Sequence, residues 1–209
     1  VQERIRGMES DFARELGTRD NLTIELTVGE KQSASCYDEL SRKKAVSALT
    51  LLPCGVMGMS FDVPNLVETS ANPGLINKYE NELSVISTSR SSVGSRKKEM
   101  RERYASIAAL SDGESVCSAD YPQWEFKANS PLREIAMSAY EELYHEKAKT
   151  CAIHAGLECG YFDEKLDGVD IISYGPIMQD VHTPRERTNI ASIERTWTLT
   201  QSILEKLAK

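Results

Sequence analysis

Hydrophobic residues fall at helical spacing in the first sixteen positions of the chain. The apolar positions on one helix face are Val1, Ile5, Met8, Phe12 and Leu16. This spacing predicts an amphipathic helix, and Gly17 follows it where a glycine commonly ends a helix. Residues 21–28 then alternate between apolar and polar side chains, a pattern that predicts a strand.

Between residues 35 and 119 the pattern alternates between helix and strand. Ser35 is a suitable N-cap for a helix that ends before Pro53, and residues 95–110 predict a second helix. The predicted strands are residues 56–60, 66–70, 83–89 and 116–119, with a bulge or bend at residues 72–74. With residues 21–28 in front, and 56–60 taken as the lead-in to the next strand, the order is β-α-β-β-α-β. This order predicts a ferredoxin-like α+β unit.

A polar segment at residues 120–130 predicts a domain boundary, which divides the chain into residues 1–121 and residues 122–209. Two helices are predicted beyond it, both with a capping residue and a proline at the start. They are residues 132–146, capped by Asn129 or Ser130 with Pro131, and a final helix with its body at residues 190–207, begun by Thr183 and Pro184.

Residues 169–173 form a β-branched run, apolar apart from one aspartate, that predicts a buried strand. Side chains capable of chemistry flank it, because His154, Gly156 and Glu158 precede it and His182 follows it. Ligands of open α/β sheets bind beyond the carboxyl ends of the strands, so the run predicts the edge of a site. Ordinary roles stay open for the same residues: a turn glycine, a helix cap and a solvated histidine.

Arg90 closes the strand predicted at residues 83–89 and begins a segment rich in serine and glycine. Backbone N–H groups at the start of a helix favour anions, and an arginine there can bind a carboxylate through two hydrogen bonds. The alternative is a solvated surface arginine.

The composition of the chain is that of an ordinary soluble domain, with 40% hydrophobic and 27% charged residues among 209. The net charge of −7 argues against nucleic acid and anionic membranes as partners. No apolar run approaches the length of a membrane span. The five cysteines have no metal-like spacing, which favours free thiols in a reducing cytoplasm.

Several strings of the sequence resemble the aminoacylhistidine dipeptidases, which are di-zinc exopeptidases that hydrolyse Xaa-His dipeptides such as carnosine. The strings are LLPCGVMGMS, LVETSANPGLI, STSRSSVGSRK, YPQWEFKANSPL, HAGLECG, SYGP and HTP, in that order along the chain. Pro73 departs from the family, which usually has leucine there. The resemblance implies a ferredoxin-like lid subdomain followed by the carboxyl-terminal part of an α/β zinc-exopeptidase catalytic domain.

The resemblance also assigns roles to individual residues. It implies that His182 is a zinc ligand, that Arg90 binds the carboxylate of the substrate, and that Gly156 offers it backbone groups. It also implies that His154 and Glu158 support the residues that bind zinc and substrate, without binding either themselves. The family's other zinc ligands and its general base lie in motifs that this sequence lacks, so no catalytic residue is assigned.

The expectation is therefore a carboxyl-terminal fragment of a cytoplasmic metallo-dipeptidase, inactive by itself. Its partners would be a dipeptide substrate, two zinc ions, the remainder of its own polypeptide and a second copy in a homodimer. Two alternatives stay open. One is a related di-zinc exopeptidase, either an aminotripeptidase or an acyl-amino-acid deacylase. The other is a non-catalytic ferredoxin-like binding module, in which Arg90 and His182 would be irrelevant to any ligand.

Overall fold

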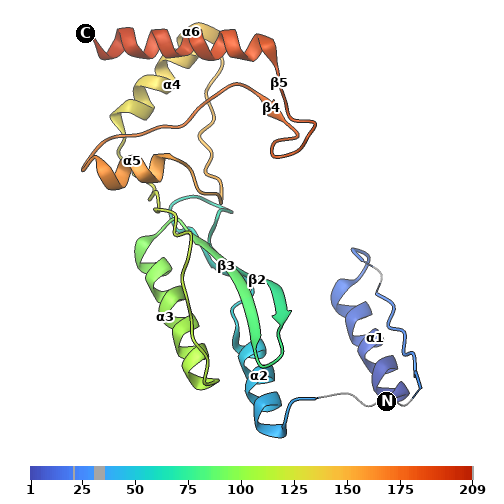
Figure 1. The fold of residues 1–209 in the computed structure, drawn as a ribbon. Coiled ribbons are helices and arrows are strands. Elements are labelled where there is room, and N and C mark those ends of the chain that lie inside the picture. Colours follow the sequence, from blue (N-terminus) through green and yellow to red (C-terminus); the bar gives the residue numbers. More distant parts are fainter. Residues whose placement is uncertain (21, 31–35, 209) are drawn as a thin grey trace. The chain divides into compact units, whose positions relative to one another are not determined.

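The computed structural model describes residues 1–20, 22–30 and 36–208, and it forms two compact units, Val1–Asp38 and Glu39–Lys209 (Figure 1). The first unit contains α1 (Gln2–Leu16), which confirms the predicted amphipathic helix. Gly17 ends the helix at φ 59°, and its N–H donates to the carbonyl of Ala13. A positive φ is costly for any residue with a Cβ, so a glycine suits this position.

The strand predicted at residues 21–28 is wrong over residues 22–28, which follow α1 without pairing in any sheet. The N–H of Ile24 donates instead to the carboxylate of Glu9 on α1, at 3.0 Å. An alternating pattern becomes a strand only beside another strand, and the described residues of this unit provide none. Residue 21 and the predicted cap at Ser35 lie outside the described residues.

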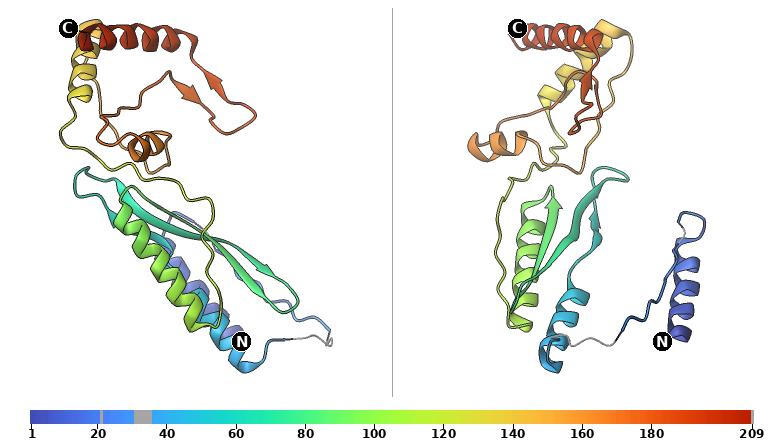
Figure 2. Two further views of the ribbon diagram at one scale, coloured as in Figure 1. Left: turned by 60° about the vertical axis from the view of Figure 1, so that its left-hand side comes forward. Right: turned by 45° about the vertical axis from the view of Figure 1, so that its right-hand side comes forward.

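The second unit begins with α2 (Glu39–Leu51), followed by a three-stranded antiparallel sheet in the order β1-β2-β3. The strands are β1 (Gly55–Met59), β2 (Val67–Lys78) and β3 (Leu83–Ser91). The helix α3 (Gly94–Leu110) runs alongside β3, where the hydroxyls of Ser87 and Tyr104 lie 2.7 Å apart (Figure 2). The strands predicted at residues 66–70 and 83–89, which lie in the paired β2 and β3, and both predicted helices are thus confirmed. The register of β2 and β3 shifts between Pro73 and Leu75, as the predicted bend requires.

The predicted strand at residues 116–119 is wrong, because this segment pairs with no strand among the described residues. The mixed α and β class is confirmed, but the ferredoxin-like order is incomplete. Its first strand, over the described residues 22–28, and its last strand, at 116–119, do not pair in the described sheet. The run at 56–60 forms β1, a strand in its own right. A strand depends on a partner that the local pattern does not reveal.

The last part of the second unit is mainly helical, with α4 (Pro131–Tyr144), α5 (Cys159–Lys165) and α6 (Ile190–Leu207). The cap of α4 is confirmed, because the Ser130 hydroxyl accepts a hydrogen bond from the N–H of Arg133. Ala139 of α4 and Ile203 of α6 are buried where the two helices pack together. No helix among the described residues has the length and apolar character that a membrane span requires.

Two further predictions are wrong. Residues 169–173 form no strand, since Asp170 instead accepts hydrogen bonds from the hydroxyl of Ser130 and the N–H of Leu132 at the start of α4. The final helix begins after Asn189, not at Thr183. Residues 180–186 instead connect the short strands β4 (Met178–Gln179) and β5 (Arg187–Thr188). The domain boundary between residues 121 and 122 stays a prediction.

Candidate functional site

Ser70 and Arg90 face each other as cross-strand partners on β2 and β3. Both side chains contact the same residue of a distant segment, His154. The hydroxyl of Ser70 lies 2.6 Å from Nε2 of His154, and Nη1 of Arg90 donates to the carbonyl oxygen of His154 at 3.3 Å. We refer to these three residues as the Ser70–His154–Arg90 cluster. It joins two residues that the sequence predicts for the site, Arg90 and His154.

The imidazole of His154 is half-buried, and this burial lowers its pKa below the usual value. The positive charge of Arg90 lowers the pKa further, while a hydrogen bond with the backbone of Val67 acts in the opposite direction. The ring is therefore neutral at pH 7. A neutral ring has one N–H and one acceptor nitrogen, so it can donate to the Val67 carbonyl and accept from the Ser70 hydroxyl.

Gly156 lies against the ring of Tyr121. A Cβ on Gly156 would stand 3.0 Å from Cδ1 of that ring, closer than most such contacts. Tyr121 in turn meets Tyr161 of α5 edge to face, with ring centroids 4.8 Å apart. Burial raises the pKa of Tyr121, and the negative charge of Glu158 adds to the effect. Gly156 is itself exposed, so its backbone groups are open to a ligand.

Glu158 precedes α5 as its N-cap residue, but its side chain makes no capping hydrogen bond. The carboxylate is exposed and lies near Tyr121. Among the described residues, no hydrogen bond or ion pair links it to Arg90, His154 or His182. Glu158 is therefore close to His154 in the sequence, but it has no direct contact of this kind with the Ser70–His154–Arg90 cluster.

His182 lies in the loop between β4 and β5, exposed and at a positive φ of 63°. Its backbone N–H donates to the carboxylate of Glu186 at 2.8 Å, and an ion pair between Asp180 and Arg187 crosses the base of the loop. Within the described ranges, no hydrogen bond or ion pair joins its imidazole to the cluster. The ring is thus free to reach a ligand.

The described residues by themselves do not make a zinc site, because no three histidine, cysteine or acidic side chains among them gather closely enough to hold a metal ion. Zinc in proteins commonly needs three or four such ligands. His182 fits the role of a single ligand to a centre completed by other residues. All five cysteines are free thiols, and four of them are exposed.

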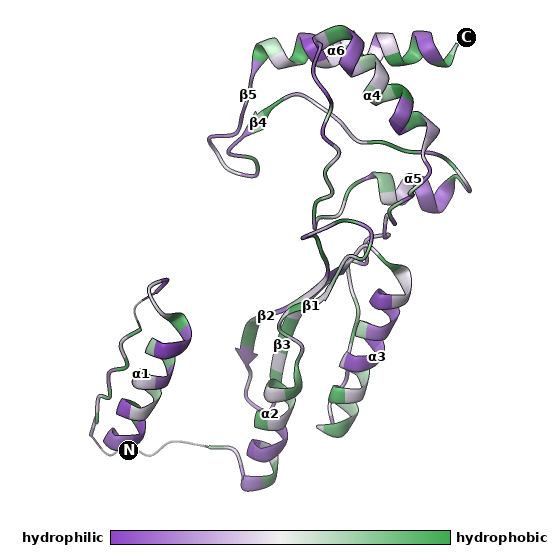
Figure 3. Ribbon diagram, turned by 180° about the vertical axis from the view of Figure 1, so that it is seen from behind, coloured by the Kyte–Doolittle hydropathy of each residue, from purple (hydrophilic) through white to green (hydrophobic). Residues whose placement is uncertain are grey.

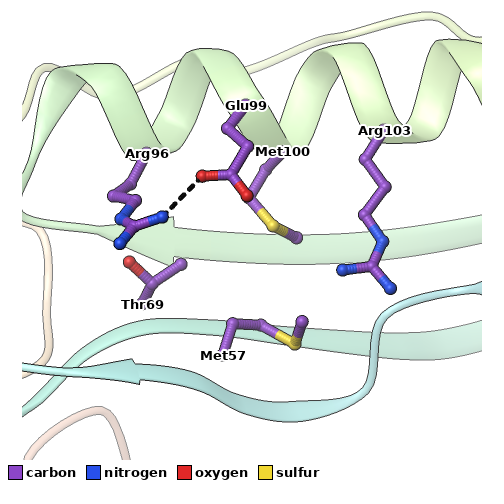
Figure 4. Close-up of a pocket in the computed structure, with 6 residues that line it drawn as sticks. All are labelled: Met57, Thr69, Arg96, Glu99, Met100 and Arg103. Atoms are coloured by element: carbon purple, nitrogen blue, oxygen red, sulfur yellow. Dashed lines mark hydrogen bonds and ion pairs between the residues drawn. The ribbon is translucent and has the colours of Figure 1, made fainter.

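A separate cavity of about 120 Å³ lies between α3 and the sheet (Figure 4). Its lining consists of Met57, Thr69, Arg96, Glu99, Met100 and Arg103. Arg96 and Glu99 form an ion pair at its edge, at 2.7 Å. None of the residues predicted for the site lines this cavity.

Three residues with close contacts in this region were not predicted from the sequence: Ser70, Tyr121 and Gly160. The register of β2 and β3 places Ser70 opposite Arg90, and nothing in the local sequence around Ser70 indicates that pairing. Gly160 allows a close approach, since a Cβ there would lie 2.5 Å from the carbonyl oxygen of Pro122. The repeated glycines of HAGLECG were a signal that this backbone needs space.

Comparison with known proteins shows similarity to peptidases. The chain is 30% identical over 196 residues to the cytosol non-specific dipeptidase of Escherichia coli (strain K12), covering 89% of this chain and 40% of that protein. The crystal structure of aminoacylhistidine dipeptidase from Vibrio alginolyticus matches 96% of this chain and 41% of its own, with 32% identity and a TM-score of 0.86. No family model matches the chain.

The aminopeptidase PepT of Bacillus cereus shares the fold, with a TM-score of 0.60 at 18% identity over 80% of this chain and 45% of its own. The chain spans about two fifths of the length of the two dipeptidases that it matches. The sequence motifs indicate a resemblance to the aminoacylhistidine dipeptidases, and the comparisons confirm it over about two fifths of the length of these proteins.

Proposed function

We propose that this chain is part of a zinc-dependent dipeptidase of the cytoplasm that hydrolyses Xaa-His dipeptides, and that it supplies the groups that recognise the substrate carboxylate. The observation that carries the proposal is the contact between Arg90 and His154. It brings the arginine expected to bind a carboxylate beside the segment whose sequence, HAGLECG, resembles the dipeptidases.

Arg90 is suited to hold a carboxylate. Its side chain is exposed, and only one of its five N–H groups, on Nη1, has a partner among the described residues. The remaining donors can form the paired hydrogen bonds with which arginine recognises a carboxylate. An exopeptidase for dipeptides needs such a group, because the carboxylate must lie at a fixed distance from the bond that is cleaved. Gly156 would add backbone groups at the same end of the substrate.

His182 would contribute one neutral nitrogen ligand to a zinc centre completed by residues beyond the described set. When bound, zinc would supply an activated water and polarise the scissile carbonyl. We assign no catalytic residue within this chain. We propose accordingly that the 209-residue chain has no dipeptidase activity without the remainder of its polypeptide. We also propose that the complete protein forms a homodimer. We propose that it binds neither nucleic acid nor membranes, which the net charge of −7 favours.

The proposal is tested by zinc content and by hydrolysis of carnosine-like dipeptides in the complete protein that contains this sequence. We expect His182→Ala to weaken zinc binding more than about a hundredfold, since even groups that only support a ligand cost ten- to a hundredfold. The control is His145→Ala, which removes an exposed histidine at the end of α4. Equal zinc content in both variants would overturn the role of His182.

A broader dipeptidase is the second candidate, because the Escherichia coli relative is named a non-specific dipeptidase. Its hallmark would be similar kcat/KM values for Xaa-His dipeptides and for dipeptides with an aliphatic second residue. A preference of more than about tenfold for histidine, which corresponds to about 1.4 kcal/mol, would favour the narrower function.

A further inference from the structure

The contacts of His154 link segments that lie far apart in the sequence. Its imidazole meets Ser70, 84 residues earlier, and its carbonyl meets Arg90, 64 residues earlier. Ser70 and Arg90 are themselves opposite each other on β2 and β3. One residue of the HAGLECG segment is therefore held by both members of a cross-strand pair.

We propose that His154 is a positioning residue, which fixes the HAGLECG segment against β2 and β3 and sets the direction of the Arg90 guanidinium for a substrate carboxylate. This inference rests on the proposed function, because it presumes that Arg90 binds that carboxylate. It adds Ser70 and His154 as the groups that prepare Arg90 for the task.

The physical basis is the flexibility of arginine. A free arginine side chain loses considerable rotamer freedom when it binds a ligand, and this loss weakens the affinity. A hydrogen bond from Nη1 to the His154 carbonyl restricts Arg90 before the substrate arrives. The carbonyl can do so only if its own direction is fixed. The bond between the imidazole and Ser70 supplies that restraint, and the close contact of Gly156 with Tyr121 holds the next turn of the chain.

The ring contacts of His154 favour positioning over direct catalysis. Nε2 lies 2.6 Å from the Ser70 hydroxyl, and the ring also bonds to the backbone of Val67. Because Nε2 is engaged by the Ser70 hydroxyl, that nitrogen is not available to bind a metal ion or to accept a proton from substrate. Among the residues that the structure describes, none forms a hydrogen bond with the ring of His182, which fits its different role.

The first test uses NMR on the 209-residue chain, whose three histidines make the ring signals simple to assign. Arg90→Ala and Ser70→Ala should each raise the titration midpoint of His154 by at least about 0.3 pH unit, because one removes a positive charge and the other a hydrogen-bond donor. The matched control is Thr88→Ala, an exposed position two residues before Arg90 on β3. If the titration midpoint of His154 is the same in both variants as in the wild type, the proposal is wrong.

The second test uses kinetics of the complete protein. His154→Gln and Ser70→Ala should raise KM for a dipeptide roughly three- to tenfold with kcat nearly unchanged, since they would disturb binding of the carboxylate only. Ser70→Thr, which keeps the hydroxyl, should restore the wild-type KM. In an Arg90→Met background His154→Gln should have no further effect, because the group that it positions is gone. A loss in kcat alone, or additive effects with Arg90→Met, would contradict the proposal.

The two tests separate failure of this inference from failure of the proposed function. If the protein cleaves dipeptides through Arg90 while His154→Gln behaves like Thr88→Ala, the positioning role is wrong and the function stands. If the NMR coupling is present but no dipeptide is cleaved, the proposed function is wrong, and with it the purpose assigned to the cluster.

Discussion

Ser70, Arg90 and His154 meet because the register of β2 and β3 places the serine opposite the arginine. Their contacts couple a titratable ring to the geometry of a guanidinium group. Burial, together with the charge of Arg90, lowers the pKa of His154, so the ring resists protonation in the folded chain. Protonation of this ring in acid, below the usual range of a histidine, would therefore disturb the cluster.

We predict that acidification weakens the cluster. A histidine with a lowered pKa in the folded state binds fewer protons than it does in the unfolded state, so the stability that it contributes is present above about pH 6.5 and is lost as pH falls through the folded pKa. Urea unfolding at pH 7.5 and pH 5 should show a larger loss of stability for the wild type than for His154→Gln. Equal losses would show that protonation of His154 is not linked to folding.

Arg90 could be predicted for the site from its sequence context and from the family resemblance, but its partners could not. Ser70 lies twenty residues earlier in a run of small polar residues, and only the pairing of two strands brings it to Arg90. His154 was expected to support the site, without its contacts being specified. Residue types and spacing indicate chemistry, whereas contacts between distant segments depend on the folded structure.

At the scale of elements, the helices were more predictable than the strands. The helices α1, α3, α4 and α6 follow local signals such as the Ser130 cap and the glycine after α1. A strand is defined by a partner, and residues 22–28, 116–119 and 169–173 have strand-like sequences without a partner strand among the described residues. In two of these segments a backbone group bonds to a side chain instead: the N–H of Ile24 donates to Glu9, and the carbonyl of Val169 accepts from Lys127.

The packing of α5 against residues 120–123 depends on Gly160. Asp120, bonded to Lys97 and Arg101 of α3, and the carbonyl of Tyr121, bonded to Lys97, tie that segment to α3. A side chain at position 160 would collide with the carbonyl oxygen of Pro122, which is backbone and cannot easily move away. The contact links α3, the segment at 120–123 and α5.

We predict that Gly160→Ala destabilises the chain by about 1–3 kcal/mol in urea unfolding, because overpacking against backbone outweighs the better helix propensity of alanine. The matched control is Gly175→Ala, where nothing lies within 4 Å of the added Cβ. That change should be neutral or stabilising by up to about 1 kcal/mol, through the unfolded state. A stable Gly160→Ala variant would mean that α5 is not held at this distance.

At the scale of the molecule, many apolar side chains of the second unit are exposed, and α6 is the clearest case. Figure 3 colours the ribbon by hydropathy and shows hydrophobic and hydrophilic residues interspersed along α6. One side of α6 packs on α4 through Ile203. Other apolar residues of the helix are exposed by half or more: Ile190, Ile193, Trp197, Leu204 and Leu207. An apolar face of this extent favours a covering partner. In the proposed dipeptidase the remainder of the polypeptide would supply it.

Trp197 provides a test of this expectation, because it is 63% exposed. In a Trp124→Phe background, the fluorescence of Trp197 in the 209-residue chain should have the emission maximum of an indole in water. The complete protein should emit at a shorter wavelength and be less accessible to iodide. Identical spectra would show that the remainder of the protein leaves this face of α6 open.

In the proposed dipeptidase, Arg90 recognises the carboxylate of a dipeptide substrate. The most direct measurement compares kcat/KM for a dipeptide and for its carboxyl-terminal amide, in the complete protein and in its Arg90→Met variant. The wild type should prefer the free carboxylate by roughly ten- to a hundredfold, the value of a charge-assisted hydrogen-bonded pair, and the variant should lose most of that preference. A preference that survives in Arg90→Met would contradict the account, because another group would then hold the carboxylate.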